Sequence, residues 1–209
     1  MVKVKICGLT RLEDALSAIE YGADALGFVF YEKSPRFMSP EAAGEIVKKL
    51  PPFVTTVGVF VNDHPSRINE VVKTAGLDMV QLHGDEPQEM CDMWPRVIKA
   101  FRVRDSRDLE RLKKYQVAAY LLDAYDPGIP GGTGQSFNWD IAVEAKQGGR
   151  VILAGGLTPD NVEKAVRRVR PYGVDVSSGV EKKKGIKDCD KMKLFIARAK
   201  STVQPGGDF

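Results

Sequence analysis

The chain has 209 residues, which is enough to bury the core of one domain and short for two. Its 43% hydrophobic and 28% charged residues are the balance of a globular protein, which argues against a disordered chain. The 31 basic and 28 acidic residues nearly cancel and are spread along the chain, so we expect no nucleic-acid partner. The only local run of charge, at 181–184, is interpreted as a solvated loop. No apolar run approaches the ~20 residues that cross a bilayer, so we expect no membrane partner.

The cysteines and histidines indicate the redox compartment and limit the metal chemistry. Cys7, Cys91 and Cys189 are odd in number and widely spaced, which suits a reducing compartment and lacks zinc-site spacing. Because only His64 and His83 accompany them, the sequence predicts no metal site. The first six residues are typical of a strand and lack the features of a signal peptide, so we predict a cytoplasmic location.

Short apolar segments alternate with segments of helical period along the whole chain. The apolar segments are rich in Val, Ile and Phe and often lack polar alternation, which is typical of parallel strands covered on both faces. We predict eight strands, at Val2–Ile6, Ala25–Phe30, Val54–Val61, Met79–Leu82, Val97–Phe101, Ala118–Leu122, Val151–Ala154 and Val174–Val176. The amphipathic segments between them predict helices at Leu12–Glu20, Pro40–Leu50, Pro65–Ala75, Asp105–Lys114, Trp139–Lys146 and Asp160–Val169. This repeated β-α order implies a parallel sheet.

Three short motifs predict where helices start. Thr10, with Glu13 three residues later, has the form of a capping box. Ser39 and Thr158 each stand before a proline, which suits a capping residue followed by the first helical residue.

Glycines mark the junctions from helix to strand. Gly22, Gly76 and Gly173 each open a Gly-apolar-Asp sequence, where glycine suits a left-handed helix end. Eight such units average about 26 residues each, which is near the compact limit of a (β/α)8 barrel. We therefore predict an α/β fold, a single (β/α)8 TIM barrel over residues 1–200, followed by a flexible tail at 201–209. A doubly wound open sheet is the alternative, although no Gly-x-Gly-x-x-Gly follows the first strand.

Two strand ends carry candidate catalytic groups, because catalytic residues of such barrels lie where strands end and in the loops that follow. Cys7 ends the first predicted strand next to a helix start, and the alternative is a buried structural cysteine. Asp123 ends the apolar sixth strand, where a low dielectric favours the neutral acid, and the alternative is a loop-capping aspartate. The long segment 124–137, rich in glycine and proline, is typical of a lid or a ligand clamp.

Two glycine-bearing turns predict a phosphate site. Gly155 and Gly156 follow the seventh strand, and Ser178 and Gly179 follow the eighth. Backbone amides of such turns, together with the start of a short extra helix, can bind phosphate oxygens. The loops after strands seven and eight are a recurrent phosphate site in this fold, whereas a tight turn would explain either glycine alone.

Three polar residues at other strand ends are candidates for substrate binding. Arg36 lies in the loop after the second strand and can hold a carboxylate bidentately, although a loop arginine is often only solvated. Gln81 near the end of the fourth strand and His83 directly after it are expected to bind the substrate, with His83 in an orienting or a ring-packing role. Metal ligation by His83 is the weaker alternative, because the sequence offers it no set of partner ligands.

The order and spacing of several motifs resemble a known family. The motifs are KICGLT at 5–10, GAD at 22–24, LGFVF at 26–30, SPR at 34–36, VGVFVN at 57–62, VQLHG at 80–84, LD at 122–123, GGTG at 131–134, AGGL at 154–157 and VDVSSGVE at 174–181. Together they are similar to the phosphoribosylanthranilate isomerases of tryptophan biosynthesis, over residues 4–200.

The resemblance implies a reaction and a role for each candidate. The reaction is the Amadori rearrangement of N-(5-phosphoribosyl)anthranilate to 1-(2-carboxyphenylamino)-1-deoxyribulose 5-phosphate, an aldose-ketose isomerisation without cofactor or metal. Asp123 would be the general acid and Cys7 the general base. Arg36 would hold the anthranilate carboxylate, and the amides around Gly156 and Gly179 the phosphate. The expected partner is this small-molecule substrate, and the expected state is a monomer or a homodimer.

Two other functions are weighed against this one. The aminoaldose isomerase of histidine biosynthesis performs the same rearrangement on a similar barrel, but that family has an aspartate where Cys7 stands and a second phosphate site that the sequence lacks. The other alternative is a non-catalytic barrel that binds phosphate or a partner protein. Such a protein has no activity, so changing Cys7 or Asp123 would not alter any.

Overall fold

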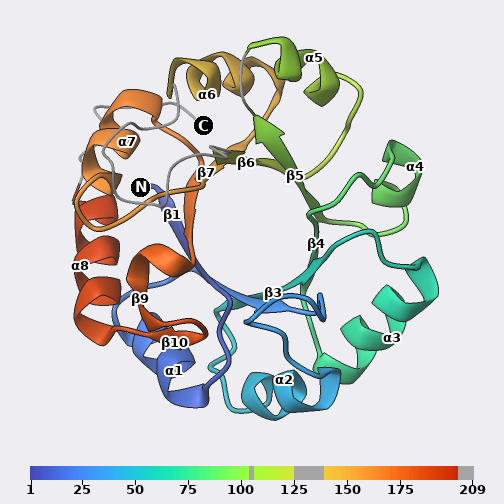
Figure 1. Cartoon of the computed structure of the whole chain (residues 1–209), viewed down its shortest axis with the longest axis vertical. Coiled ribbons are helices and arrows are strands. Elements are labelled where there is room, and N and C mark those ends of the chain that lie inside the picture. The colour runs from blue at the N-terminus through green and yellow to red at the C-terminus, as the bar shows by residue number, and fades with distance from the viewer. Residues whose placement is uncertain (104–105, 125–138, 202–209) are drawn as a thin grey trace.

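The computed structural model describes residues 1–103, 106–124 and 139–201 (Figure 1). Eight parallel strands form a closed barrel, in which each strand pairs with the next along the chain and β8 pairs with β1. Their bounds are β1 Lys3–Cys7, β2 Ala25–Val29, β3 Thr55–Phe60, β4 Met79–Leu82, β5 Val97–Val103, β6 Ala119–Ala124, β7 Val151–Ala154 and β8 Gly173–Val176. Closure of β8 onto β1 confirms the predicted (β/α)8 TIM barrel and excludes the open doubly wound sheet.

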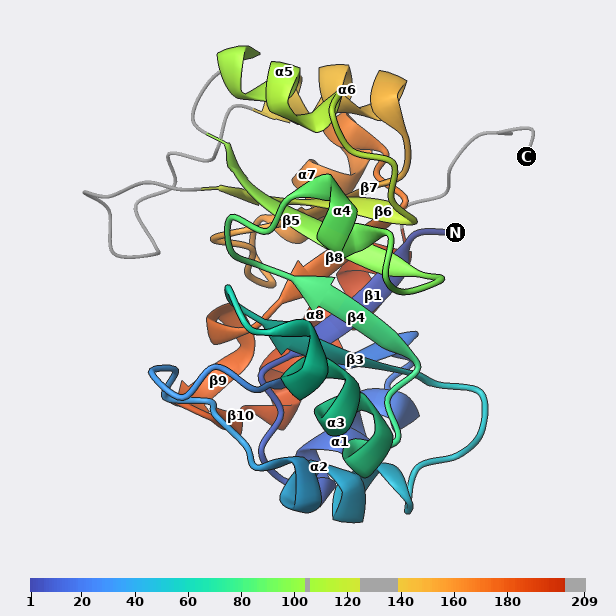
Figure 2. The same ribbon diagram turned by 90° about the vertical axis from the view of Figure 1, so that its right-hand side faces the viewer.

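Helices surround the barrel on its outer side (Figures 1 and 2). Their bounds are α1 Leu12–Glu20, α2 Pro40–Val47, α3 Pro65–Ala75, α4 Gln88–Cys91, α5 Leu109–Leu112, α6 Trp139–Ala145, α7 Val162–Val169 and α8 Cys189–Lys200, with 3₁₀ helices at Ser106–Asp108, Lys146–Gly148 and Ser178–Val180. No helix in the described part of the chain is both long and apolar enough to cross a membrane. The predicted tail at 201–209 lies, after Ser201, outside the described residues.

The strands bury both of their faces. One buried cluster packs between the strands and the helices, and a smaller cluster fills the barrel interior with residues such as Ile98 and Leu121. Because side chains alternate along a strand, every second residue of each strand enters the interior. Asp123 follows Leu121 by two residues on β6, so its side chain lies on the same interior face of the strand.

The predicted helix starts are confirmed in one case of three. Ser39 caps α2, because its Oγ accepts a hydrogen bond from a backbone N–H of the first turn at 3.2 Å. The capping box at Thr10 is wrong: α1 starts after Arg11, and the Thr10 hydroxyl instead donates to the carbonyl of Gly185. Thr158 is also wrong as a cap, since its hydroxyl closes a local turn and α7 starts only after Asn161.

The glycine junctions follow the prediction at two of the three positions. Gly22 and Gly76 have φ angles of +100° and +68°, in the left-handed region that favours glycine. Gly173 instead begins β8, and Arg170 takes the left-handed position at the end of α7 with a φ of +48°.

A small hairpin follows β8. Its antiparallel strands are β9, Glu181–Lys183, and β10, Ile186–Lys187. The interpretation of 181–184 as solvated is correct for its three exposed lysines, but 181–183 form a strand rather than a loop, and the Glu181 side chain is only 6% exposed. Glu181 turns inward because two buried or half-buried cations face it.

Candidate active site

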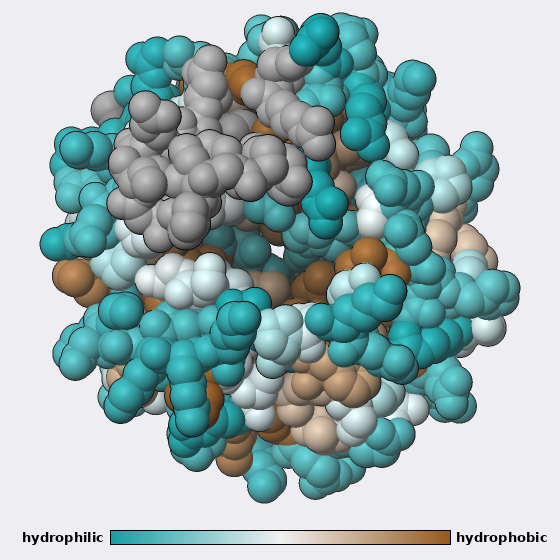
Figure 3. Space-filling view, in the orientation of Figure 1, coloured by the Kyte–Doolittle hydropathy of each residue, from teal (hydrophilic) through white to brown (hydrophobic). Residues whose placement is uncertain are grey.

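All nine residues predicted to act on the substrate line one pocket at the carboxyl ends of the strands. The pocket has a volume of about 330 Å³, which suits a small molecule. Figure 3 shows this face of the barrel, which is hollowed near its centre. A wider hollow of about 790 Å³ beside α4 contains none of the nine. The residues are Cys7, Arg36, Gln81, His83, Asp123, Gly155, Gly156, Ser178 and Gly179. The predicted lid or clamp, including the GGTG motif, lies beyond Ala124 and outside the described residues.

Cys7 is the last residue of β1, and its thiol lies beside a buried ion pair. Lys5 Nζ donates to Asp175 Oδ1 at 2.8 Å, and both side chains are buried. A methyl group added to Gly27 would lie 2.8 Å from Cys7 Sγ and 3.0 Å from Lys5 Nζ, so only glycine leaves room for both groups here. Burial raises the pKa of the Cys7 thiol and Asp175 raises it further, while Lys5 and Lys187 oppose both. Cys7 is therefore a thiol at neutral pH until a ligand changes this balance.

Asp123 belongs to a chain of polar contacts along one wall of the pocket. His83 Nε2 lies 3.2 Å from Asp123 Oδ2, and Gln81 Nε2 lies 2.9 Å from His83 Nδ1. Since the Gln81 amide donates to Nδ1, the imidazole carries its proton on Nε2 and donates it to Asp123. The Asp123 side chain is 32% exposed. The apolar sequence of the strand predicts an apolar environment for Asp123. In the structure its carboxyl group instead faces His83 and the open pocket.

The turns after β7 and β8 meet at the predicted phosphate site. Gly155 and Gly156 have φ angles of +75° and +65°, which favour glycine. Gly156 is fixed from behind, because its carbonyl accepts a hydrogen bond from Asn161 Nδ2 at 2.9 Å. A side chain at Gly179 would overlap the carbonyl oxygen of Leu157, so the two turns touch backbone to backbone. The 3₁₀ helix Ser178–Val180 supplies the predicted short extra helix.

We expect Gly179→Ala to weaken the binding of inorganic phosphate about tenfold, the loss of roughly one charge-assisted hydrogen bond. The new methyl group overlaps the Leu157 carbonyl and must push the two turns apart. The measurement is phosphate affinity by calorimetry, beside thermal unfolding. The matched control is Gly44→Ala on α2, where the methyl group would lie 3.0 Å from the Thr74 carbonyl oxygen, far from the pocket. Equal phosphate affinity in the two variants would contradict the phosphate site.

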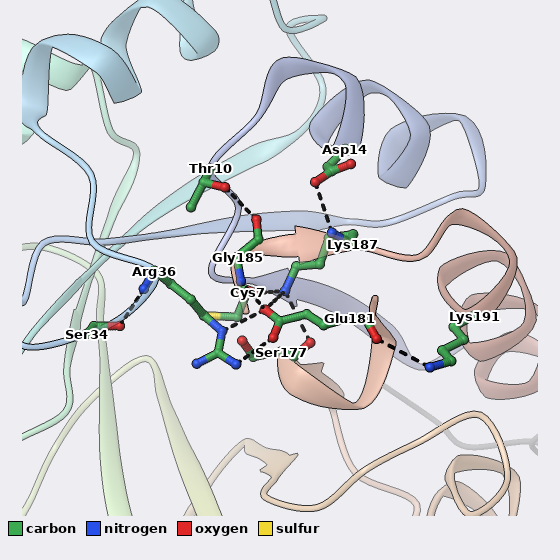
Figure 4. A network of polar contacts seen from close by, with 10 residues as sticks. All are labelled: Cys7, Thr10, Asp14, Ser34, Arg36, Ser177, Glu181, Gly185, Lys187 and Lys191. Atoms are coloured by element: carbon green, nitrogen blue, oxygen red, sulfur yellow. Dashed lines mark hydrogen bonds and ion pairs between the residues drawn. The ribbon is translucent and has the colours of Figure 1, made fainter. Parts of the chain in front are cut away.

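The guanidinium of Arg36 is already held by a carboxylate of the chain itself (Figure 4). Arg36 Nε donates to Glu181 Oε1 and Nη2 donates to Glu181 Oε2, each at 2.6 Å. This bidentate pairing fixes the plane of the guanidinium. Arg36 still lines the pocket and its side chain is 19% exposed. Its binding of a ligand carboxylate stays a prediction, for which the Nη1 group remains.

Four residues of this site are missing from the sequence prediction. Lys5 stands two residues before Cys7, and Asp175 stands two residues before Ser177. Since every second residue of a strand lies on the same face, this spacing is a signal that could have found both. Glu181 and Lys187 carry no comparable local signal, because they meet the pocket residues Arg36 and Cys7 only through the folding of the hairpin.

The comparisons with known proteins agree with this geometry. The family model for N-(5'-phosphoribosyl)anthranilate (PRA) isomerase matches residues 4–198. The chain is 61% identical to the N-(5'-phosphoribosyl)anthranilate isomerase of Geotalea uraniireducens, over 96% of this chain and 99% of that protein. It is similar to the crystal structure of phosphoribosyl anthranilate isomerase from Thermotoga maritima, with a TM-score of 0.90 and 50% identity over 96% and 99% of the two chains. A further structure of such an isomerase, in complex with reduced 1-(o-carboxyphenylamino)-1-deoxyribulose 5-phosphate, has a TM-score of 0.87 and 48% identity over the same shares. The chain therefore belongs to the phosphoribosylanthranilate isomerase family.

Proposed function

We propose that this isomerase converts N-(5-phosphoribosyl)anthranilate to 1-(2-carboxyphenylamino)-1-deoxyribulose 5-phosphate in tryptophan biosynthesis. The observation that carries the proposal is the single pocket that holds a thiol, a carboxyl group and two phosphate-type turns together. The distances and hydrogen bonds of these groups support the following roles.

Asp123 is the general acid of the proposed mechanism. Its Oδ2 faces His83 Nε2–H, which leaves Oδ1 to carry a proton toward the furanose ring oxygen. Protonation lets the ring open to a Schiff base without expelling an alkoxide. The Asp123 carboxylate that remains keeps the His83 hydrogen bond, so the negative charge formed in this step is stabilised.

Cys7 is the general base. After ring opening, the proton on C2 is acidified by the adjacent iminium, whose nitrogen comes from the substrate itself. The Cys7 thiolate removes this proton, and the enolamine then tautomerises to the ketone. Since burial favours the thiol, the thiolate depends on the ammonium groups of Lys5 and Lys187, which lower the pKa that burial raises.

The two ends of the substrate are bound by opposite parts of the pocket. The amides around Gly156 and Gly179 bind the phosphate, and Arg36 binds the anthranilate carboxylate. Anchors at both ends hold the reacting carbons between acid and base. Gln81 Oε1 is a buried side-chain oxygen without a hydrogen-bond partner among the described residues, which favours its use as an acceptor for a substrate hydroxyl.

The finer features of the enzyme are part of the same proposal. It acts as an aldose-ketose isomerase, an intramolecular oxidoreductase, and needs no cofactor because the substrate nitrogen serves as the electron sink. We also propose a cytoplasmic location and a monomeric or homodimeric state.

The test is an assay of freshly prepared phosphoribosylanthranilate, followed by the loss of its fluorescence. We expect turnover by the wild-type protein, with the ketose phosphate as product. A wild-type protein without turnover would refute the proposed reaction.

A further inference from the structure

Glu181 lies between two cations, Arg36 and Lys187, of which Arg36 lines the pocket (Figure 4). Its Oε1 accepts from Arg36 Nε at 2.6 Å and from Lys187 Nζ at 3.0 Å, while Oε2 accepts from Arg36 Nη2 at 2.6 Å. The Glu181 side chain is 6% exposed. Burial would raise the pKa of Glu181, but Arg36 and Lys187 outweigh it and hold the pKa below its ordinary value. Glu181 therefore stays a carboxylate between the two cations.

Lys187 ties this carboxylate to the ends of two barrel strands. Its side chain is wholly buried, and Nζ also donates to the carbonyl oxygens of Cys7 at 2.6 Å and Ser177 at 3.1 Å. Its backbone N–H donates to the buried Asp14 at 3.1 Å, which fixes β10 against α1. Lys187 thus places Glu181 relative to the residue that ends β1 and the residue that follows β8.

The stem of Arg36 is fixed as well. A side chain at Gly8 would overlap Arg36 Cδ, so the aliphatic part of Arg36 lies directly against the backbone after β1. Gly8 has a φ of +70°, which also favours glycine. The stem packs on Gly8 and the guanidinium is held on two of its nitrogens by Glu181, so few orientations of Nη1 remain.

We infer that Glu181, held by Lys187, is a positioning residue that aims Arg36 at the carboxylate of the substrate. Within the described part of the chain, the pairing with Glu181 leaves the Nη1 group of Arg36 without a partner and fixes its direction, so the enzyme binds a carboxylate at one place relative to Cys7. This inference rests on the proposed function, and it adds the residue that makes Arg36 selective. If the ion pair of Glu181 only stabilised the fold, its loss would weaken the binding of all ligands alike.

The experiment compares the binding of two ligands to Glu181→Gln by calorimetry. One is reduced 1-(o-carboxyphenylamino)-1-deoxyribulose 5-phosphate, and the other is the same compound without its carboxylate. We expect about tenfold weaker binding of the first and unchanged binding of the second, because only the first uses Arg36. In turnover, KM should rise while kcat changes little. Equal weakening of both ligands, or of neither, would overturn the inference.

Three further variants make the result specific. In an Arg36→Met background, Glu181→Gln should have no additional effect on the carboxylated ligand, because residues that act through one another are not additive. Glu163→Gln removes another arginine-paired glutamate, on the exposed side of α7, and should leave both affinities unchanged. If Glu181→Gln does not fold because it leaves Lys187 buried without its counter-charge, Glu181→Asp keeps the charge, shortens the reach and should show the same selective loss. Full additivity in the Arg36→Met background would also overturn the inference.

A failure of the proposed function would look different. In that case the wild-type protein would neither turn over phosphoribosylanthranilate nor bind the carboxylated ligand. A failure of the inference alone would leave wild-type turnover and binding intact, with Glu181→Gln behaving like Glu163→Gln.

Discussion

Replacing Asp123 by asparagine is expected to lower kcat/KM about a hundred- to ten-thousand-fold, the usual contribution of a general acid. The carboxamide has nearly the same shape, and its oxygen can still accept the hydrogen bond from His83 Nε2. It has no acidic proton, so the furanose ring cannot open with protonation of its oxygen. Steady-state kinetics measures the loss, and thermal unfolding should show a melting temperature close to the wild-type value.

Asp92→Asn is the matched control for this change. Asp92 Oδ1 accepts a side-chain hydrogen bond from Gln88 Nε2 at 2.6 Å, but it lies beside α4, outside the pocket. This variant should keep the wild-type kcat/KM. Substantial activity in Asp123→Asn, in a sample free of wild-type protein, would refute the role of Asp123 as the acid.

The barrel itself could be predicted because its physical signals are local. A parallel strand that is buried on both faces must be a short, nearly continuous apolar run, and all eight runs appear in the sequence. The ends of the elements were harder to place, because a local motif competes with partners that are distant in sequence. Thr10 has the sequence form of a capping residue, yet its hydroxyl donates to Gly185, which lies 175 residues away.

The site could be predicted only as far as strand ends define it. Cys7 and Asp123 lie on interior faces of β1 and β6, so a rule about strand ends finds them. Arg36 and Glu181 are separated by 145 residues, and Glu181 opens a run of exposed lysines that indicates a solvated surface. Their pairing depends on how a hairpin folds back over β1. The local sequence around either residue does not predict this contact, because the contact forms between elements that are distant along the chain.

We expect Cys7→Ser to lower kcat/KM by about a hundred- to ten-thousand-fold as well, since a serine hydroxyl is far too weakly acidic to supply the base. The wild-type enzyme should in addition show a characteristic pH dependence. Burial raises the pKa of the Cys7 thiol, and in the proposed mechanism the thiolate is the base. kcat/KM should therefore rise with pH and keep rising to the ordinary thiol value of about 8.5 and beyond. In Cys7→Ser this rising limb should disappear.

Alkylation of Cys7 by iodoacetamide measures the titration of the same thiol independently of the isomerisation. It is measured in a Cys189→Ser background, because Cys189 is the exposed thiol of the described residues. Cys91 is buried like Cys7 and burial raises its pKa to about 11, so Cys91→Ser is added to the background and Cys7 is left as the thiol that reacts. The rate at Cys7 should increase over the same pH range as kcat/KM, because both depend on one thiolate. If the two profiles rise at different pH values, the base that limits the isomerisation is a group other than Cys7.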